Sequence, residues 1–198
     1  WEIKTNTENN GESILSDVAK AVDNKLAQEA ISKDDVQGIG IGVPGPVDSQ
    51  GVVHRCVNLG WGVVNVAEEL GNLTGLKIKV GNDANVAALG EMWQGGAKGS
   101  KDVIMVTLGT GVGGGIIVDG KVVAGFNGAG GEIGHITVNN DEIEACNCGQ
   151  YGCLEQYTSA TGIVRLAKRK LAKSTEETSI REIPNLTAKD VFDAAKAG

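Results

Sequence analysis

The segment Leu76-Lys-Ile-Lys-Val80-Gly-Asn82-Asp83-Ala-Asn85-Val-Ala-Ala-Leu89 decides the fold. Its first five residues predict a strand, and the apolar residues after Asp83 fall at helical spacing, so Asn82 and Asp83 stand at a strand-to-helix corner. Ligands of open α/β sheets bind at the carboxyl ends of strands. Asn82 and Asp83 are therefore candidates for a binding site, with a plain helix cap as the alternative because Asn and Asp are favoured there.

The segments on either side of this corner alternate between helix and strand, which predicts an α/β protein. Before them, the alternating run at residues 2–6 resembles a further strand. The predicted elements, in chain order, are a helix over 14–26, a strand over 36–43, a hairpin at 49–51, a helix over 66–73, strands over 103–108 and 116–118, a helix over 160–173, and a capped helix from Thr187. The chain begins at Trp1 without a methionine and stops just after an amphipathic helix, so we expect a fragment of a longer protein.

Composition excludes two classes of partner. The chain has 198 residues, 41% of them hydrophobic, and no apolar run near the roughly 20 residues that a membrane span requires. Its formal charge of -7 leaves no broad basic face for nucleic acid, and the cluster Lys168-Arg169-Lys170 is interpreted as a solvated helix face. We therefore expect a soluble cytoplasmic protein that binds neither membrane nor nucleic acid.

One histidine and three cysteines are spaced to bind a metal. His135 lies eleven residues before the run Cys146-Asn-Cys148-Gly-Gln-Tyr-Gly-Cys153. A Cys3His set fills all four positions of tetrahedral zinc and leaves none for a catalytic water, so we expect a structural Zn²⁺ ion. Unpaired thiols are the alternative, whereas a disulfide is disfavoured because Cys146 and Cys148 are too close for an easy bridge.

Two carboxylates flank these ligands. Glu132 lies three residues before His135, and Glu155 lies two residues after Cys153. A closed metal site would therefore also fix the positions of both carboxylates, although Glu132 taken alone could be a solvated residue.

A glycine-rich turn follows the strand over 103–108. The run Gly109-Thr-Gly-Val-Gly-Gly-Gly115 is not a P-loop, because no Gly-Lys-Ser/Thr follows, and not a dinucleotide fingerprint, because a strand closed by Asp119-Gly120 follows. Its backbone N–H groups can bind phosphate, with a plain hairpin as the alternative. The candidate phosphate-binding residues are Gly109, Thr110, Gly111, Gly113 and Gly114.

These candidates together favour phosphoryl transfer to a polyhydroxyl acceptor. Carboxylates and amides suit sugar hydroxyls, a glycine turn suits the phosphates, and the acceptor alcohol needs one base. We expect Asp83 to be that base.

Four motifs in order resemble the ROK family (repressor, open reading frame, kinase). They are Gly81-Asn-Asp-Ala-Asn-Val-Ala-Ala-Leu-Gly-Glu91, Leu108-Gly-Thr-Gly-Val-Gly-Gly-Gly115, Gly131-Glu-Ile-Gly-His135 and Cys146-x-Cys-Gly-x-x-Gly-Cys153-Leu-Glu155. The resemblance covers about residues 36–171 and implies part of an actin-like ATPase (ribonuclease H-like) fold, that of two-domain sugar kinases. Residues 1–100 would be the remainder of the small N-terminal α/β domain, and residues 101–198 the first part of the large α/β domain with the zinc loop.

The resemblance also implies an activity. It is the phosphorylation of glucose at its 6-hydroxyl to glucose 6-phosphate, the first step of glycolysis, with ATP and Mg²⁺, in a cleft between the domains that closes on the sugar. Asp83 would be the general base, and His135 would use one ring nitrogen for zinc and the other near the sugar. The substrate-binding residues would be Asn82, Asp83, Glu132, His135 and Glu155. A homo-oligomer, dimeric or tetrameric, is expected.

Two alternatives stay open. One is a sugar-sensing repressor of the same family with an N-terminal helix-turn-helix, which has no need of Asp83 or of the complete glycine turn. The other is a kinase for another hexose, such as N-acetylmannosamine or fructose. Family kinases begin with a phosphate-binding strand-turn-strand that is not seen here, so residues 1–198 alone are expected to show little or no turnover.

Overall fold

The computed structural model describes residues 1–198, apart from the side chain of Val57. The residues group into two compact units. Unit 1 contains residues 1–104 and 115–131, and unit 2 contains residues 105–114 and 132–198. The sequence predicts one domain boundary near residue 100. The two units interleave along the chain, so they do not test that boundary, and the division stays a prediction.

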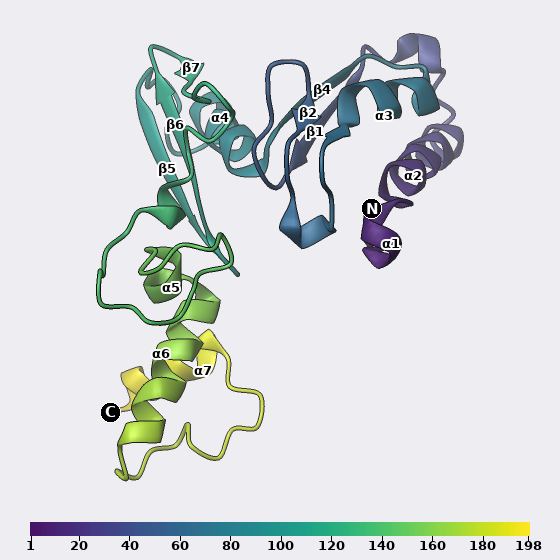
Figure 1. The fold of residues 1–198 in the computed structure, drawn as a ribbon. Helices are drawn as coiled ribbons and strands as arrows, with labels where there is room; N and C mark the ends of the chain where they lie inside the picture. Colours follow the sequence, from purple (N-terminus) through teal and green to yellow (C-terminus); the bar gives the residue numbers. More distant parts are fainter. The chain divides into compact units, whose positions relative to one another are not determined.

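The order of elements is α/β, as predicted (Figure 1). The elements are α1 (Glu8–Gly11), α2 (Ile14–Gln28), η1 (Lys33–Asp35), β1 (Ile39–Val43), β2 (Val52–Val53), η2 (Val57–Leu59), β3 (Val64–Asn65), α3 (Val66–Thr74), β4 (Ile78–Asn82), α4 (Asp83–Gln94), β5 (Val103–Leu108), β6 (Val112–Val118), β7 (Lys121–Val122), η3 (Ile133–His135), α5 (Glu155–Thr158), α6 (Ala160–Lys173) and α7 (Ala188–Ala197).

Unit 1 is built on a parallel pair of strands. β1 pairs with β4 from Ile39 opposite Ile78 to Val43 opposite Asn82, and the short strands β2 and β3 form an antiparallel pair. α2 contacts α3, and α3 contacts β4. The register places Asn82 at the carboxyl end of the pair, beside the loop that leaves β1.

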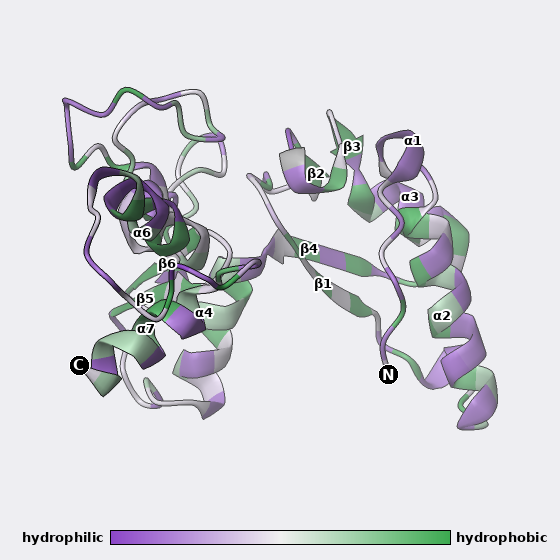
Figure 2. Ribbon diagram, turned by 90° about the horizontal axis from the view of Figure 1, so that it is seen from below, coloured by the Kyte–Doolittle hydropathy of each residue, from purple (hydrophilic) through white to green (hydrophobic). Residues whose placement is uncertain are grey.

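The apolar core of unit 1 lies among these elements. α2 carries apolar and polar residues on different sides, visible as green and purple bands in Figure 2. The buried cluster is Ile14, Leu15, Val43, Val47, Val53, Cys56, Trp61 and Val66. The indole N–H of Trp61 donates to the carbonyl oxygen of Gly11 at 3.2 Å, so the buried indole nitrogen has a hydrogen-bond partner.

Two local expectations are wrong. Residues 2–6 form no strand, since their short alternation offers only Ile3 as an apolar side chain, and Ile3 is 42% exposed. The strand expected at 116–118 begins earlier, at Val112, in the sheet ordered β5-β6-β7. Gly115 lies within this strand, where a Cβ atom would come 2.5 Å from the Cβ atom of Ala88, so glycine allows α4 to pack closely on β6.

Unit 2 buries polar side chains beside its apolar ones. α6 contacts both α5 and α7, and Thr187 and Asp190 form the predicted capping box of α7. Buried side chains of this unit include Glu142, Gln156 and Ser159. Apolar burial alone therefore contributes less here than in unit 1. No helix in residues 1–198 combines the length and the apolar character needed to cross a membrane.

Candidate functional site

Asn82 and Asp83 occupy the predicted corner in unit 1. Asn82 ends β4 and caps α4, because its Oδ1 accepts the N–H of Asn85 at 3.1 Å while its Nδ2 donates to the carbonyl oxygen of Gly45 at 3.2 Å. Asp83 is the first residue of α4, and its Oδ1 accepts the N–H of Ala84 at 2.8 Å. The cap interpretation thus holds for Asn82, and the Asp83 carboxylate has one oxygen fixed by the backbone.

A cavity of about 730 Å³ lies in unit 1 beside this corner. Asn82 and Asn85 contribute to its wall, together with glycines of β1 and the exposed Phe126. Asp83 is not among the lining residues. The cavity and the Asp83 carboxylate are therefore separate features of the corner.

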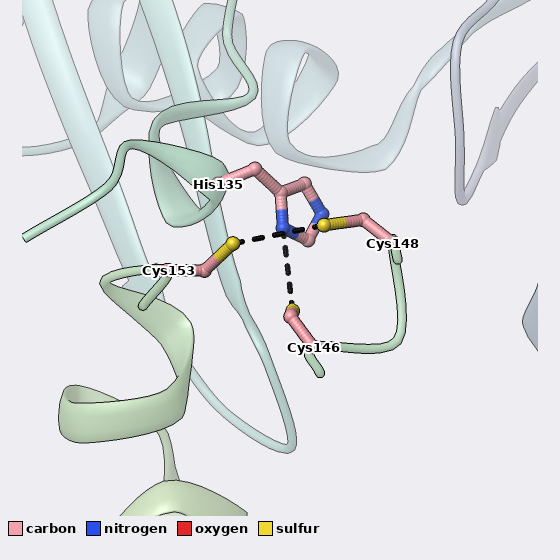
Figure 3. Close-up of side chains that lie close together, drawn as sticks. All are labelled: His135, Cys146, Cys148 and Cys153. Atoms are coloured by element: carbon pink, nitrogen blue, oxygen red, sulfur yellow. Dashed lines mark hydrogen bonds between the residues drawn. The ribbon is translucent and has the colours of Figure 1, made fainter. Parts of the chain in front are cut away.

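His135, Cys146, Cys148 and Cys153 converge in unit 2, as the sequence predicts. Their ligand atoms all lie within 4.8 Å of one another. Figure 3 shows the imidazole of His135 and the three sulfur atoms facing a common point. The Nδ1 atom of His135 is 3.8 Å from the Sγ atom of Cys146, and the Sγ atoms of Cys148 and Cys153 are 3.6 Å apart.

These distances fit a tetrahedral zinc ion. Zn–S bonds of about 2.3 Å at tetrahedral angles separate two sulfur atoms by roughly 3.8 Å. Burial, followed by the neighbouring thiols of Cys148 and Cys146, raises the pKa of the Cys153 thiol to about 12. A bound cation would reverse this effect, because cysteines coordinate as thiolates. The soft donor set of three sulfurs and one imidazole therefore suits Zn²⁺ better than Mg²⁺ or Ca²⁺.

The two flanking carboxylates lie beside this centre. The Nε2 atom of His135 is 3.9 Å from an oxygen of Glu132, so the two ring nitrogens face different groups. Glu155 is the first residue of α5, and the thiol of Cys146 lies 3.8 Å from its Oε1. The structure thus brings together Glu132, His135 and Glu155 in unit 2, whereas Asn82 and Asp83 belong to unit 1.

The glycine turn is shorter than expected. It consists of residues 109–111, while Gly113 and Gly114 lie inside β6. The Oε2 atom of Glu155 accepts the N–H of Val112 at 2.9 Å. A Cβ atom on Gly111 would lie 2.3 Å from that oxygen, so glycine at this position allows the carboxylate to reach the backbone.

A buried ion-pair network escaped the sequence-based reasoning. The side chain of Glu142 is 1% exposed and accepts hydrogen bonds from Arg165 at 3.0 Å and Arg169 at 2.9 Å. Tyr157 donates to the same carboxylate at 2.7 Å. Glu144 also accepts from Arg165 at 2.9 Å. The network ties the loop between His135 and Cys146 to α6.

The interpretation of Lys168-Arg169-Lys170 as a merely solvated face is therefore wrong for Arg169. Its guanidinium pairs with the buried carboxylate of Glu142. Arg165 and Arg169 are four residues apart and so lie on one face of α6, from which both reach this carboxylate. In the sequence, the spacing of the two arginines and the acidic residues within 141–144 indicate that an ion pair could form. This pattern could not reveal which carboxylate is buried.

We expect Glu142→Gln to lower the thermal midpoint of the protein by an amount on the order of 10 °C at pH 7, since removing one charge of a buried network costs about 3 kcal/mol. Arg165, followed by Arg169 and Tyr157, holds the pKa of Glu142 well below its usual range. The stabilisation is therefore present above the unfolded pKa of about 4.3 and is lost as pH falls toward the depressed value.

Thermal melts of both proteins between pH 7 and pH 3 test this expectation. Glu144→Gln is the matched control, because its side chain is 50% exposed and pairs with the same arginines. A midpoint difference that grows as pH falls, or an equal loss in the control, would contradict the assignment.

Comparison with known proteins supports a relationship over the whole chain. A sequence model described as the ROK family matches residues 2–197. A glucokinase of Halalkalibacterium halodurans is 45% identical over 201 residues, which cover 100% of this chain and 61% of that protein. A xylose repressor of Caldicellulosiruptor bescii is 35% identical over 82% of this chain and 41% of its own length.

A solved structure gives the same result. The crystal structure of a ROK family glucokinase from Streptomyces griseus, in complex with glucose and AMPPNP, matches with a TM-score of 0.79 and 35% identity, over 100% of this chain and 63% of that chain. The fold expected from the sequence, part of the actin-like ATPase fold of sugar kinases, is confirmed. The chain spans about three fifths of the length of two glucokinases that it matches, 61% in each case.

Proposed function

Because this chain belongs to the ROK family, we propose that the protein transfers the γ-phosphoryl group of ATP, bound with Mg²⁺, to the 6-hydroxyl of glucose. The observation that carries the proposal is the position of Asp83, a carboxylate at a strand-to-helix corner. The relatives that are glucokinases, at 45% and 35% identity, support glucose as the acceptor.

Asp83 is assigned the role of general base. Its Oδ1 is held by the N–H of Ala84, which fixes the carboxylate, and the other oxygen is assigned to the sugar hydroxyl. Phosphoryl transfer depends mainly on positioning and electrostatics, so a base that is already oriented loses little conformational freedom when it reacts. Gly109, Thr110 and Gly111 are assigned to the phosphates of ATP, with Gly113 and Gly114 following in β6.

The ring hydroxyls are assigned to Asn82, Asp83, Glu132, His135 and Glu155. A zinc ion held by His135, Cys146, Cys148 and Cys153 would stabilise the loop that carries three of them, and it would have no coordination position left for water. His135 would bind the metal through Nδ1, which leaves Nε2 on the side of Glu132. The metal is therefore proposed as structural.

A kinase assay of the full-length protein with ATP and a panel of sugars tests the proposal. Glucose, fructose, mannose and N-acetylmannosamine separate the hexose alternatives. We expect clear preference for glucose. Turnover that favours another sugar would change the substrate assignment, and no turnover despite sugar binding would overturn the kinase proposal.

The second candidate is a sugar-sensing repressor. It is favoured by one observation, the 35% identity with a xylose repressor over 82% of the chain. A sensor would bind sugar without transferring phosphate and would change its affinity for operator DNA when sugar binds. Gel-shift measurements with and without sugar on the full-length protein distinguish the two functions.

Gly111→Ala is expected to weaken glucose binding about fivefold while zinc is retained. The new methyl group would displace the nearby carboxylate of Glu155, a flexible side chain that can move. Calorimetric titration with glucose measures the effect. Gly109→Ala is the control, because a Cβ atom there meets nothing within 4 Å. Equal affinities in the two variants would contradict a sugar contact by Glu155.

The proposed enzyme is assigned to the cytoplasm, where ATP is available and thiols stay reduced. All four cysteines are unpaired, which suits that compartment. A homo-oligomer remains our expectation, and sedimentation of the full-length protein tests it.

A further inference from the structure

The glycine turn is held by the junction between α5 and α6. The N–H of Ala160 donates to the carbonyl oxygen of Gly109 at 2.9 Å. The hydroxyl of Thr161 donates to the carbonyl oxygen of Thr110 at 2.7 Å, across 51 residues of sequence. Two successive carbonyl groups of the turn are thus fixed by the first two residues of α6.

Fixing these carbonyls also fixes the N–H groups that follow them. All peptide bonds of the chain are trans, and in a trans peptide the carbonyl and the next N–H point in opposite directions. The N–H groups of Thr110 and Gly111 are therefore directed to the side of the turn away from α6. Successive N–H groups directed to one side are the arrangement that binds phosphate oxygens.

Thr161 is itself held at a defined place. Ser159, which is fully buried, caps α6 by accepting the N–H of Gly162 at 2.9 Å and donates to the carbonyl oxygen of Glu155 at 2.7 Å. The start of α6 is thereby anchored to α5. The hydroxyl of Thr161 transmits that fixed position to the turn.

We propose that Thr161 is a positioning residue for the nucleotide, because its hydroxyl orients the peptide group between Thr110 and Gly111 toward the phosphates. The identity of the ligand, a nucleoside triphosphate, rests on the proposed function. Thr161 contacts the turn through this hydrogen bond, so we expect its substitution to change nucleotide affinity rather than sugar affinity.

Three variants of the full-length protein test this inference. Thr161→Val keeps the shape and removes the hydroxyl, Thr161→Ser keeps the hydroxyl, and Thr158→Val is the matched control. The hydroxyl of Thr158 donates to the carbonyl oxygen of Leu154 within the neighbouring turn, and so it has the same chemistry without contact to residues 109–111. The measurements are calorimetric affinities for AMPPNP with Mg²⁺ and for glucose, and amide hydrogen exchange over residues 109–114.

We expect Thr161→Val to raise the Kd for AMPPNP about fivefold to tenfold, the effect of one lost hydrogen bond, and to speed exchange in the turn. The Kd for glucose and the zinc content should stay unchanged. Thr161→Ser should lie within about twofold of the wild type, and Thr158→Val should match it.

An unchanged Kd for AMPPNP in Thr161→Val, or an equal loss in Thr158→Val, would overturn the inference. Wild-type protein that binds glucose but no AMPPNP would overturn the proposed kinase function and the nucleotide role of Thr161 with it. In that case, faster amide exchange over residues 109–114 in Thr161→Val, but not in Thr158→Val, would still support the conclusion that Thr161 fixes the turn. Unchanged exchange in Thr161→Val would reject that conclusion.

Discussion

Asp83→Asn is expected to reduce kcat of the full-length enzyme about a thousandfold, in the range that general bases contribute. Asparagine has the same shape, and its side-chain oxygen can still accept the N–H of Ala84, so the start of α4 should persist. Only the proton acceptor is lost. The Kd for glucose should therefore change by no more than about threefold.

A steady-state assay and a glucose titration of the same preparation separate these effects. Asp102→Asn is the matched control, because its exposed carboxylate also accepts one backbone N–H, from Asp119 at 2.9 Å. Turnover of Asp83→Asn within about tenfold of the wild type would show that another group takes the proton.

Cys148→Ala is expected to release the zinc ion and to raise the Kd for glucose at least tenfold, about the effect of a lost partner at a metal site. Cys148 is exposed, so alanine there opens no buried cavity, and the effect reports on the missing ligand. Unit 2 has few buried apolar side chains, and metal binding would contribute directly to the order of its loop. Loss of the metal should therefore also disorder Glu132 and Glu155, which flank the ligands.

Zinc per chain after dialysis against a chelator, followed by a glucose titration, measures both consequences. Asn147→Ala is the control, because Asn147 is exposed and lies between two ligands in the same loop. Wild-type glucose affinity in a zinc-free Cys148→Ala protein would refute the coupling between metal and sugar.

Local patterns predicted the features that depend on local spacing. The strand-to-helix corner at Asn82 follows from a short strand that ends in polar residues, and the Cys3His set follows from ligand spacing. The structure contains the corner and brings the four side chains together, because residues near in sequence determine both features, and the binding of zinc by the four side chains stays a prediction. The roles of these residues in binding and catalysis stay predictions.

Features that depend on distant partners were beyond sequence patterns. Glu142 is buried because two arginines 23 and 27 residues later reach it, and spacing alone cannot choose between Glu142 and Glu144. Gly115 lies inside β6 rather than in the turn, where it is in close contact with Ala88 of α4. The hydrogen bond from the hydroxyl of Thr161 to the carbonyl oxygen of Thr110 is likewise a tertiary contact. Tertiary packing decided each of these outcomes.

The interleaving of the two units has a consequence for synthesis on the ribosome. Unit 1 needs residues 115–131, which emerge only after the first piece of unit 2, residues 105–114, has been made. Residues 105–114 must then wait for residues 132–198 before their own unit is complete. The glycine turn therefore leaves the ribosome long before Glu155 and Thr161. Nascent chains halted at a point where residue 131, but neither Glu155 nor Thr161, has left the exit tunnel should resist protease in unit 1 but be cut in the turn.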